Sequence, residues 1–175
     1  VWTQKPDGAD ELTLTDDLIL SPPIIKLAPK ARQVVRLARL APPDASRQLS
    51  YRFILREIPE ATPSGNIQVP IALALSMPVF ITPPGAKRNV ECKVADRSAG
   101  GIAVQCANSG SAYAQIREFV ITRGEQRIAR FEGGAYILPG ASKTIAVGTE
   151  AAATPGDARL VVTFDDNQTQ QFRLS

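Results

Sequence analysis

The sequence predicts an all-β protein built from antiparallel β-sandwiches. Its 175 residues include fourteen prolines and twelve glycines, which divide the chain into short segments. Turn signals recur roughly every 8–12 residues, as they do in sandwich folds. The segments between the turns are rich in Val, Ile, Leu, Thr and Phe. No long segment repeats its apolar residues at the 3.6-residue period of a helix.

The expected strands follow one another in short runs along the whole chain. The run at 32–40 comes closest to a helical pattern, but its adjacent Val34 and Val35 and the flanking Pro29 and Pro42 favour a strand. The expected strands cover residues 11–20, 32–40, 48–58, 66–82, 89–95, 101–107, 113–122, 126–132, 142–148, 158–165 and 169–174.

A domain boundary is expected at 82–87, where two prolines and a glycine end a strand and stiffen a short connection. It divides the chain into domains at 1–83 and 84–175. The second domain has the seven strands of an immunoglobulin-type sandwich. The first has too few strands and begins inside what resembles one, so we expect that its opening strands are missing from this chain.

The composition excludes several classes of function. The chain has no histidine and two cysteines, which excludes Ser-His-Asp and Cys-His catalysis and the common zinc sites. The formal net charge is +3 and the basic residues are scattered, so nothing indicates nucleic-acid binding. No apolar stretch is long enough to span a membrane. We expect no enzymatic activity, no cofactor, no metal and no membrane insertion.

Residues 67–81 carry the sharpest pattern, because every odd position is aliphatic and no charged residue occurs from Ile67 to Pro84. A period of two over this length predicts one long strand with an apolar face. Pro70 and Pro78 cannot donate to a ladder, so at least one edge of the strand is expected to be open. The strand is either buried in its own sandwich or an edge strand for a partner. The absence of protective charges favours the partner.

The two cysteines, Cys92 and Cys106, flank a turn at 96–101 and fall on neighbouring antiparallel strands. This spacing allows them to lie directly opposite each other. In an oxidising compartment they would form a disulfide. The alternative is a pair of separate buried thiols.

Two stretches of the first half resemble the periplasmic pilus-assembly chaperones. Residues 21–37, SPPIIKLAPKARQVVRL, are similar to the family pattern of Pro-Pro, a short apolar run, Leu-x-Pro-Gly and a Val-Arg-Leu strand. Residues 51–59, YRFILREIP, are similar to the family signature aromatic-x-x-x-Leu-Arg-Glu-Ile-Pro. The alternating strand follows at the family's position, so the resemblance covers about 22–83.

The resemblance implies a boomerang of two immunoglobulin-like domains with a cleft between them. It also implies a periplasmic chaperone that binds pilus or fimbrial subunits and delivers them to an outer-membrane usher. Chaperone–pilin donor-strand complementation is itself an established instance of β-strand addition. By alignment, Val69, Ile71 and Leu73 are the central donor residues, and Ile67 and Leu75 flank them. Self-association through the same strand is also expected.

The resemblance further implies basic side chains that hold the carboxylate of the subunit's C-terminus. The family's Lys near the end of the donor strand is replaced here by Pro78. We expect Arg52, placed opposite the region of Leu75 in the hairpin, to supply the guanidinium instead, and Arg56 is a second candidate. The family's interdomain Glu–Arg salt bridge is also altered, because Gln48 and Thr82 occupy its positions.

A second hypothesis is a two-domain sandwich that acts as a surface adhesin or a structural pilus subunit. The two hypotheses differ in how residues 67–81 are used. A subunit would bury their aliphatic face within itself, whereas a chaperone presents that face to a partner.

Overall fold

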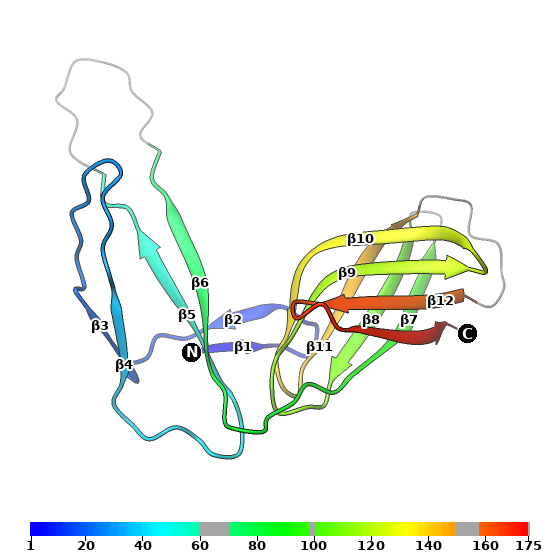
Figure 1. Cartoon of the computed structure of the whole chain (residues 1–175), viewed down its shortest axis with the longest axis horizontal. Helices are drawn as coiled ribbons and strands as arrows, with labels where there is room; N and C mark the ends of the chain where they lie inside the picture. The colour runs from blue at the N-terminus through cyan, green and yellow to red at the C-terminus, as the bar shows by residue number, and fades with distance from the viewer. Residues whose placement is uncertain (60–70, 99–100, 150–157, 175) are drawn as a thin grey trace.

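The computed structural model describes residues 1–59, 71–98, 101–149 and 158–174. All the regular secondary structure in these ranges is β-strand, which confirms the all-β prediction. The described residues contain no helix that is long and apolar enough to cross a membrane. Figure 1 shows an upright arm formed by β3–β6 and a broad lobe formed by β7–β13, set at an angle and joined at the base.

A small hairpin lies at the junction between the arm and the lobe (Figure 1). It pairs β1 (Trp2–Gln4) with β2 (Asp10–Leu12). The predicted strand at 11–20 is therefore wrong, because β2 ends at Leu12 and the next strand begins at Leu18. The backbone N–H of Asp17 donates to Thr15 Oγ1 at 3.2 Å. Such local side-chain bonds favour turns over strands.

The arm contains two further antiparallel hairpins. One pairs β3 (Leu18–Ser21) with β4 (Arg36–Arg39), and the other pairs β5 (Leu49–Arg56) with β6 (Ala74–Ile81). The predicted strand at 66–82 is thus shorter in the structure. Its first residues, 66–70, lie outside the described ranges.

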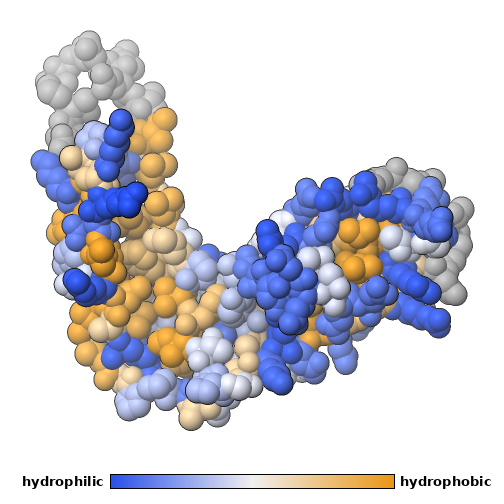
Figure 2. All heavy atoms as spheres, viewed as in Figure 1, coloured by the Kyte–Doolittle hydropathy of each residue, from blue (hydrophilic) through white to orange (hydrophobic). Residues whose placement is uncertain are grey.

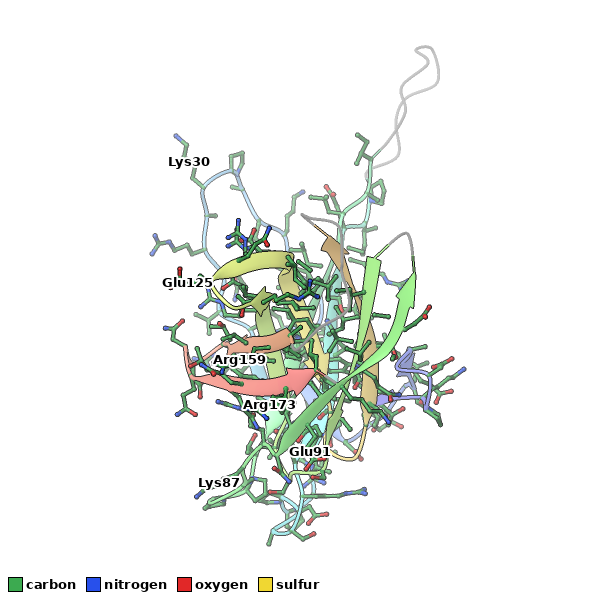
Figure 3. The ribbon with its side chains drawn as sticks, turned by 90° about the vertical axis from the view of Figure 1, so that its right-hand side faces the viewer. Lys30, Lys87, Glu91, Glu125, Arg159 and Arg173 are labelled. Atoms are coloured by element: carbon green, nitrogen blue, oxygen red, sulfur yellow. A yellow bond between two sulfur atoms is a disulfide. The ribbon has the colours of Figure 1, made fainter. Side chains whose placement is uncertain are left out.

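The connection between β3 and β4 contains a tight turn at residues 28–31. The N–H of Ala31 donates to the carbonyl of Ala28 at 3.0 Å, Pro29 is the second residue, and Lys30 has a φ of 64°. Proline followed by a residue with positive φ is typical of a type II turn, which favours glycine at the position of Lys30. The turn explains why a Leu-x-Pro-Gly pattern suits this place. Lys30 projects from the outer end of the hairpin (Figure 3).

The lobe is a seven-stranded antiparallel structure, as the sequence predicted for the second half. The strand order is β13-β12-β9-β10-β11-β8-β7, and only two residue pairs join β10 to β11. The lobe therefore consists of two sheets linked at one side. The strands are β7 (Val90–Ser98), β8 (Gly101–Asn108), β9 (Ala114–Arg123), β10 (Gln126–Ile137), β11 (Ser142–Thr149), β12 (Ala158–Phe164) and β13 (Thr169–Leu174).

One hydrophobic core fills the lobe, and all its buried members come from residues 90–174. Strands β8 and β12 alternate buried and more exposed residues, so each strand presents one face to the core. Phe119, Phe164 and Leu160 are among the fully buried side chains, and each contributes roughly 1.5–3 kcal/mol of hydrophobic stabilisation. The lobe therefore has a hydrophobic core formed by its own residues.

A disulfide joins β7 and β8 on this core. Cys92 lies directly opposite Cys106 in the ladder, and the two sulfurs are bonded. Both cysteines are buried. The structure confirms the pairing expected from their spacing and removes the alternative of two separate thiols.

Candidate functional site

The aliphatic residues of the arm are the first component of the candidate site. Along β6 and the residues before it, the exposed fraction falls from 82% at Ile71 to 62% at Leu73, 53% at Leu75 and 40% at Met77. We call these four residues the aliphatic row. Figure 2 shows apolar residues gathered along this side of the arm, next to the notch that separates the arm from the largely hydrophilic lobe. Ile67 and Val69, the other expected donor residues, lie outside the described ranges.

Strand β6 is paired on one edge only among the described residues, where β5 is its sole neighbour. The N–H of Glu57 donates to the carbonyl of Leu73 at 2.8 Å, so the backbone of Leu73 points toward β5. Backbone groups in an antiparallel strand alternate between its two edges. Ala74, Ser76 and Pro78 therefore direct their backbone groups to the open edge. Pro78 has no N–H, so the row of donors on that edge is interrupted there.

Glu57 also holds the loop end of the β5–β6 hairpin through its side chain. Its Oε2 accepts a hydrogen bond from the N–H of Leu73 at 3.1 Å. This contact and the backbone bond between the same residues extend the pairing one residue beyond β6. The aliphatic row is therefore held in an extended conformation at least from Leu73 onward.

Arg52, the expected carboxylate anchor, lies opposite Pro78, and Leu55 is the residue opposite Leu75. The expected pairing of Arg52 with the Leu75 region is therefore wrong by three residues. The difference arises because the observed ladder, with Arg56 opposite Ala74, is centred farther along the chain than the expected loop at 59–66. Arg52 thus faces the position at which the resemblance implies a lysine.

The guanidinium of Arg52 lies between elements of the arm, the junction hairpin and the lobe. Its carbon atom is 3.9 Å from the ring centroid of Trp2 and 5.8 Å from that of Tyr136 on β10. Its Nη2 is 3.8 Å from Asp10 Oδ2, and its side chain is 18% exposed. In the part of the chain that the structure describes, no acceptor takes a hydrogen bond from this guanidinium. Its donors are consequently available to a carboxylate.

The two rings next to Arg52 belong to a cluster of four aromatic rings that was not identified from the sequence. The rings of Phe80 and Tyr113 are stacked at 3.9 Å, and Trp2 meets Tyr136 edge-on at 5.4 Å. Trp2 also lies 5.8 Å from Phe80. These residues are far apart in the sequence, and only the folded chain brings them together. Arg56, the second anchor candidate, is exposed and lies opposite Ala74, farther along the arm.

A buried glutamine joins the arm to the lobe. The Oε1 of Gln48 accepts hydrogen bonds from Thr82 Oγ1 at 3.0 Å and from the N–H of Tyr113 at 3.1 Å. Its Nε2 donates to Ser50 Oγ at 3.1 Å. Gln48 and Thr82 are the two residues at the positions of the family's interdomain salt bridge. Here a network of neutral groups connects them. We call this contact between the arm and the lobe the joint.

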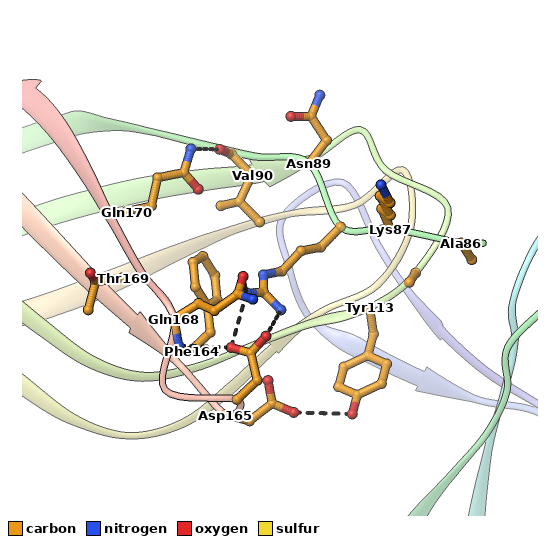
Figure 4. Close-up of a pocket in the computed structure, with 13 residues that line it drawn as sticks. Ala86, Lys87, Asn89, Val90, Tyr113, Phe164, Asp165, Gln168, Thr169 and Gln170 are labelled. Atoms are coloured by element: carbon orange, nitrogen blue, oxygen red, sulfur yellow. Dashed lines mark hydrogen bonds and ion pairs between the residues drawn. The ribbon is translucent and has the colours of Figure 1, made fainter. Parts of the chain in front are cut away.

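A polar cavity of about 760 Å³ lies beside the joint, on the lobe (Figure 4). Arg88 forms two hydrogen bonds with the carboxylate of Asp166, at 2.8 and 3.0 Å, and lies over the ring of Phe164. The hydrogen bond from Arg88 lowers the pKa of Asp166. Burial, followed by the charge of Asp165, raises the pKa of Tyr113, whose hydroxyl donates to Asp165. Because Arg88 pairs with Asp166 and Asp165 accepts from Tyr113, we assign this cavity a structural role.

The first half of the chain matches a known family. Residues 1–87 match the family model described as pili and flagellar-assembly chaperone, PapD N-terminal domain. Through these residues the chain belongs to the pilus-assembly chaperones. The resemblance drawn from residues 21–37 and 51–59 is thereby confirmed. No curated protein matches the sequence closely.

Solved structures of chaperones share the fold over most of the chain. A CsuC–CsuE chaperone–tip adhesion subunit complex from archaic Csu pili of Acinetobacter baumannii aligns with a TM-score of 0.65 and 17% identity, covering 99% of this chain and 80% of that chain. The YadV chaperone aligns with a TM-score of 0.61 and 14% identity, covering 90% and 77%. The CupB2 chaperone of Pseudomonas aeruginosa aligns at 0.56 and 16%, covering 90% and 73%. The fold is therefore that of two immunoglobulin-like domains arranged as a boomerang.

Proposed function

We propose that this chaperone binds pilus or fimbrial subunits by donor-strand complementation and delivers them to an outer-membrane usher. The observation that carries the proposal is the exposed aliphatic row beside a strand edge that has no pairing partner among the described residues. Proteins normally protect such edges with charges or bulges. A structural pilus subunit would bury this face in its own sandwich, so the exposure favours a chaperone.

The open edge of β6 would pair with the subunit while the aliphatic row fills the subunit's groove. Ile67, Val69, Ile71, Leu73 and Leu75 are the proposed donor residues. Each contributes roughly 1.5–3 kcal/mol when it is fully buried, before the costs of ordering and association are subtracted. The pairing would end near Pro78, where the edge lacks an N–H. Without a subunit, the same edge is available to a second copy of the chain.

Arg52 is the proposed anchor for the carboxylate of the subunit's C-terminus. It lies directly across the hairpin from Pro78, where the pairing with the subunit would stop. A guanidinium binds a carboxylate through two parallel hydrogen bonds, and the fork of Arg52 has no hydrogen-bond acceptor among the described residues. Arg56 is less suitable because it is exposed and lies farther from Pro78.

The disulfide between Cys92 and Cys106 suits the periplasm, which is an oxidising compartment. Membership of the first half in the pilus-assembly chaperones supports the proposed delivery to an usher. Exchange of strands and side chains supplies the driving force, so the proposed mechanism requires no nucleotide.

The proposal is tested by co-purifying the full-length chaperone with a co-expressed pilus subunit from the periplasm. Leu73→Arg would place an unpaired charge in the apolar groove, which costs several kcal/mol, and subunit recovery should fall to background. The new arginine faces Glu57 across the hairpin, so the free chaperone should still fold. Ala72→Arg is the matched control, because its side chain projects from the other face and should largely retain the subunit. Normal recovery with Leu73→Arg would contradict the donor-strand proposal.

A further inference from the structure

A carboxylate of the chaperone itself already lies next to the proposed anchor. Asp10 Oδ2 is 3.8 Å from Arg52 Nη2, and it is the only carboxylate that forms an ion pair with Arg52 among the described residues. Asp10 belongs to β2 of the junction hairpin, whereas Arg52 belongs to β5 of the arm. The pair therefore forms between two different elements at the base of the arm.

Gln4 holds the carboxylate of Asp10 in this place. Its Nε2 donates to Asp10 Oδ1 at 3.0 Å and to the carbonyl of Tyr136 at 2.9 Å. Its Oε1 accepts from the N–H of Leu138 at 2.9 Å. The side chain of Gln4 is thus fixed to the lobe at both ends. Because its amide also binds Asp10, the carboxylate remains close to Arg52 rather than turning toward solvent.

The contact between Asp10 and Arg52 is loose. A charge-assisted hydrogen bond between nitrogen and oxygen is about 2.7–2.9 Å long, whereas this pair is separated by 3.8 Å and forms no hydrogen bond. The side chain of Asp10 is 40% exposed, and ion pairs at such sites contribute little. A carboxylate that forms two short hydrogen bonds with Arg52 would therefore displace Asp10.

We propose that Asp10 is an internal competitor for the anchor, so that a C-terminal carboxylate binds Arg52 only by displacing Asp10. This inference rests on the proposed role of Arg52. In the free chaperone, Asp10 partly neutralises the guanidinium of Arg52 and weakens its attraction for anions other than the C-terminal carboxylate of a subunit. A subunit tail that pairs with β6 brings its carboxylate to Arg52 in bidentate geometry and takes the place of Asp10.

The single tryptophan of the chain offers a direct measurement of this exchange. Trp2 lies 3.9 Å from the Arg52 guanidinium, so its fluorescence should respond when the partner of Arg52 changes. The probe is a short acetylated peptide of alternating Val and Thr with a free C-terminal carboxylate. Its C-terminal amide is the matched ligand without the charge. Both are titrated into the full-length chaperone.

Asp10→Asn should tighten binding of the free-acid peptide by up to about fivefold, the range of an exposed ion pair, and leave binding of the amide unchanged. Asn retains the oxygen that accepts from Gln4, so the hairpin should be preserved. Asp7→Asn is the charge-matched control. Asp7 lies in the turn of the same hairpin, where its Oδ1 accepts from the N–H of Ala9, and it should have no effect. In an Arg52→Ala background, Asp10→Asn should also have no effect.

The outcomes separate this inference from the proposed function. If the free acid binds better than the amide and Arg52→Ala abolishes that preference, Arg52 is the anchor. If Asp10→Asn then leaves the preference unchanged or reduces it, Asp10 is not a competitor and the inference is overturned. If the wild-type chaperone binds acid and amide equally, the anchor proposal fails, and the inference fails with it.

Discussion

The side-chain oxygen of Gln48 accepts a hydrogen bond from the backbone N–H of Tyr113 at 3.1 Å. Gln48 directly precedes β5 of the arm, and Tyr113 directly precedes β9 of the lobe. The same oxygen accepts from Thr82, at the end of the arm. One neutral side chain thus satisfies donors from both parts of the molecule. Because amides and hydroxyls do not titrate near neutral pH, this joint should keep its geometry across the range in which an ion pair would weaken.

Gln48→Leu should destabilise the joint. The variant keeps a similar volume but leaves the N–H of Tyr113 and the hydroxyl of Thr82 without their acceptor, at a cost of about 1–3 kcal/mol. Urea unfolding should show the loss as a lower midpoint, and small-angle scattering should show a wider spread of arm–lobe angles. Gln171→Leu, at an exposed position on β13, is the control. Equal midpoints for the two variants would contradict the role of Gln48.

Reduction of the disulfide should lower the stability of the lobe. Cys92 and Cys106 are separated by 14 residues, and closing a loop of that size contributes about 3 kcal/mol. Guanidinium unfolding with and without a reductant measures the difference, and a Cys92→Ala, Cys106→Ala double variant checks that the reductant acts through this bond. If the midpoint does not change on reduction, the bond does not contribute to the fold as predicted.

Residues 84–175 should fold as an isolated domain. The lobe's core consists of residues from within 90–174, and the disulfide also lies inside this range. The fragment should give a cooperative thermal transition and dispersed amide signals in NMR spectra. Conversely, a fragment that remains unfolded would place the domain boundary elsewhere and would mean that contacts with the arm are required.

Strand positions in the lobe were predictable because one pattern controls them. Buried residues alternate with exposed ones along β8 and β12, and Pro, Gly and Asn mark the turns between strands. The cysteine pairing was expected from a two-residue repeat around a turn at 96–101. In the structure β7 continues to Ser98, and a register shift between Val94 and Asp96 brings Cys92 opposite Cys106. Local rules located the seven strands of the lobe, although β10 continues to Ile137, beyond the expected end at 132.

The candidate site was predicted in part. Ile71, Leu73 and Leu75 were recognisable from their alternation, and their exposure agrees with an unpaired apolar face. The register of Arg52 was not predictable, because it depends on the length of a connection that carries no short-turn signal. The contacts of Trp2 with Arg52 and Tyr136 were also not predictable. They join residues from three separate hairpins, and no periodicity links such residues.

The last prediction concerns the pairing of Arg52 with Pro78. The two residues lie directly opposite each other in β5 and β6. Side chains of such a pair project from the same face, with Cβ atoms about 4.5–5.5 Å apart. A cation at position 78 should therefore reach the same carboxylate as a cation at position 52. Arg52→Ala should reduce recovery of a co-expressed pilus subunit, and adding Pro78→Lys should restore much of it.

The geometry of the ladder makes Pro78→Lys a tolerable change. The backbone of residue 78 faces the open edge of β6, so the new N–H meets solvent or the subunit rather than a neighbouring carbonyl group of β5. Pro78→Ala in the Arg52→Ala background separates the effect of the charge from that of removing proline, and it should not restore recovery. Arg56→Ala should have little effect in any background. Restoration by alanine as well as lysine would show that proline, rather than the missing cation, limits binding, and Arg52 would then lose its role as the anchor.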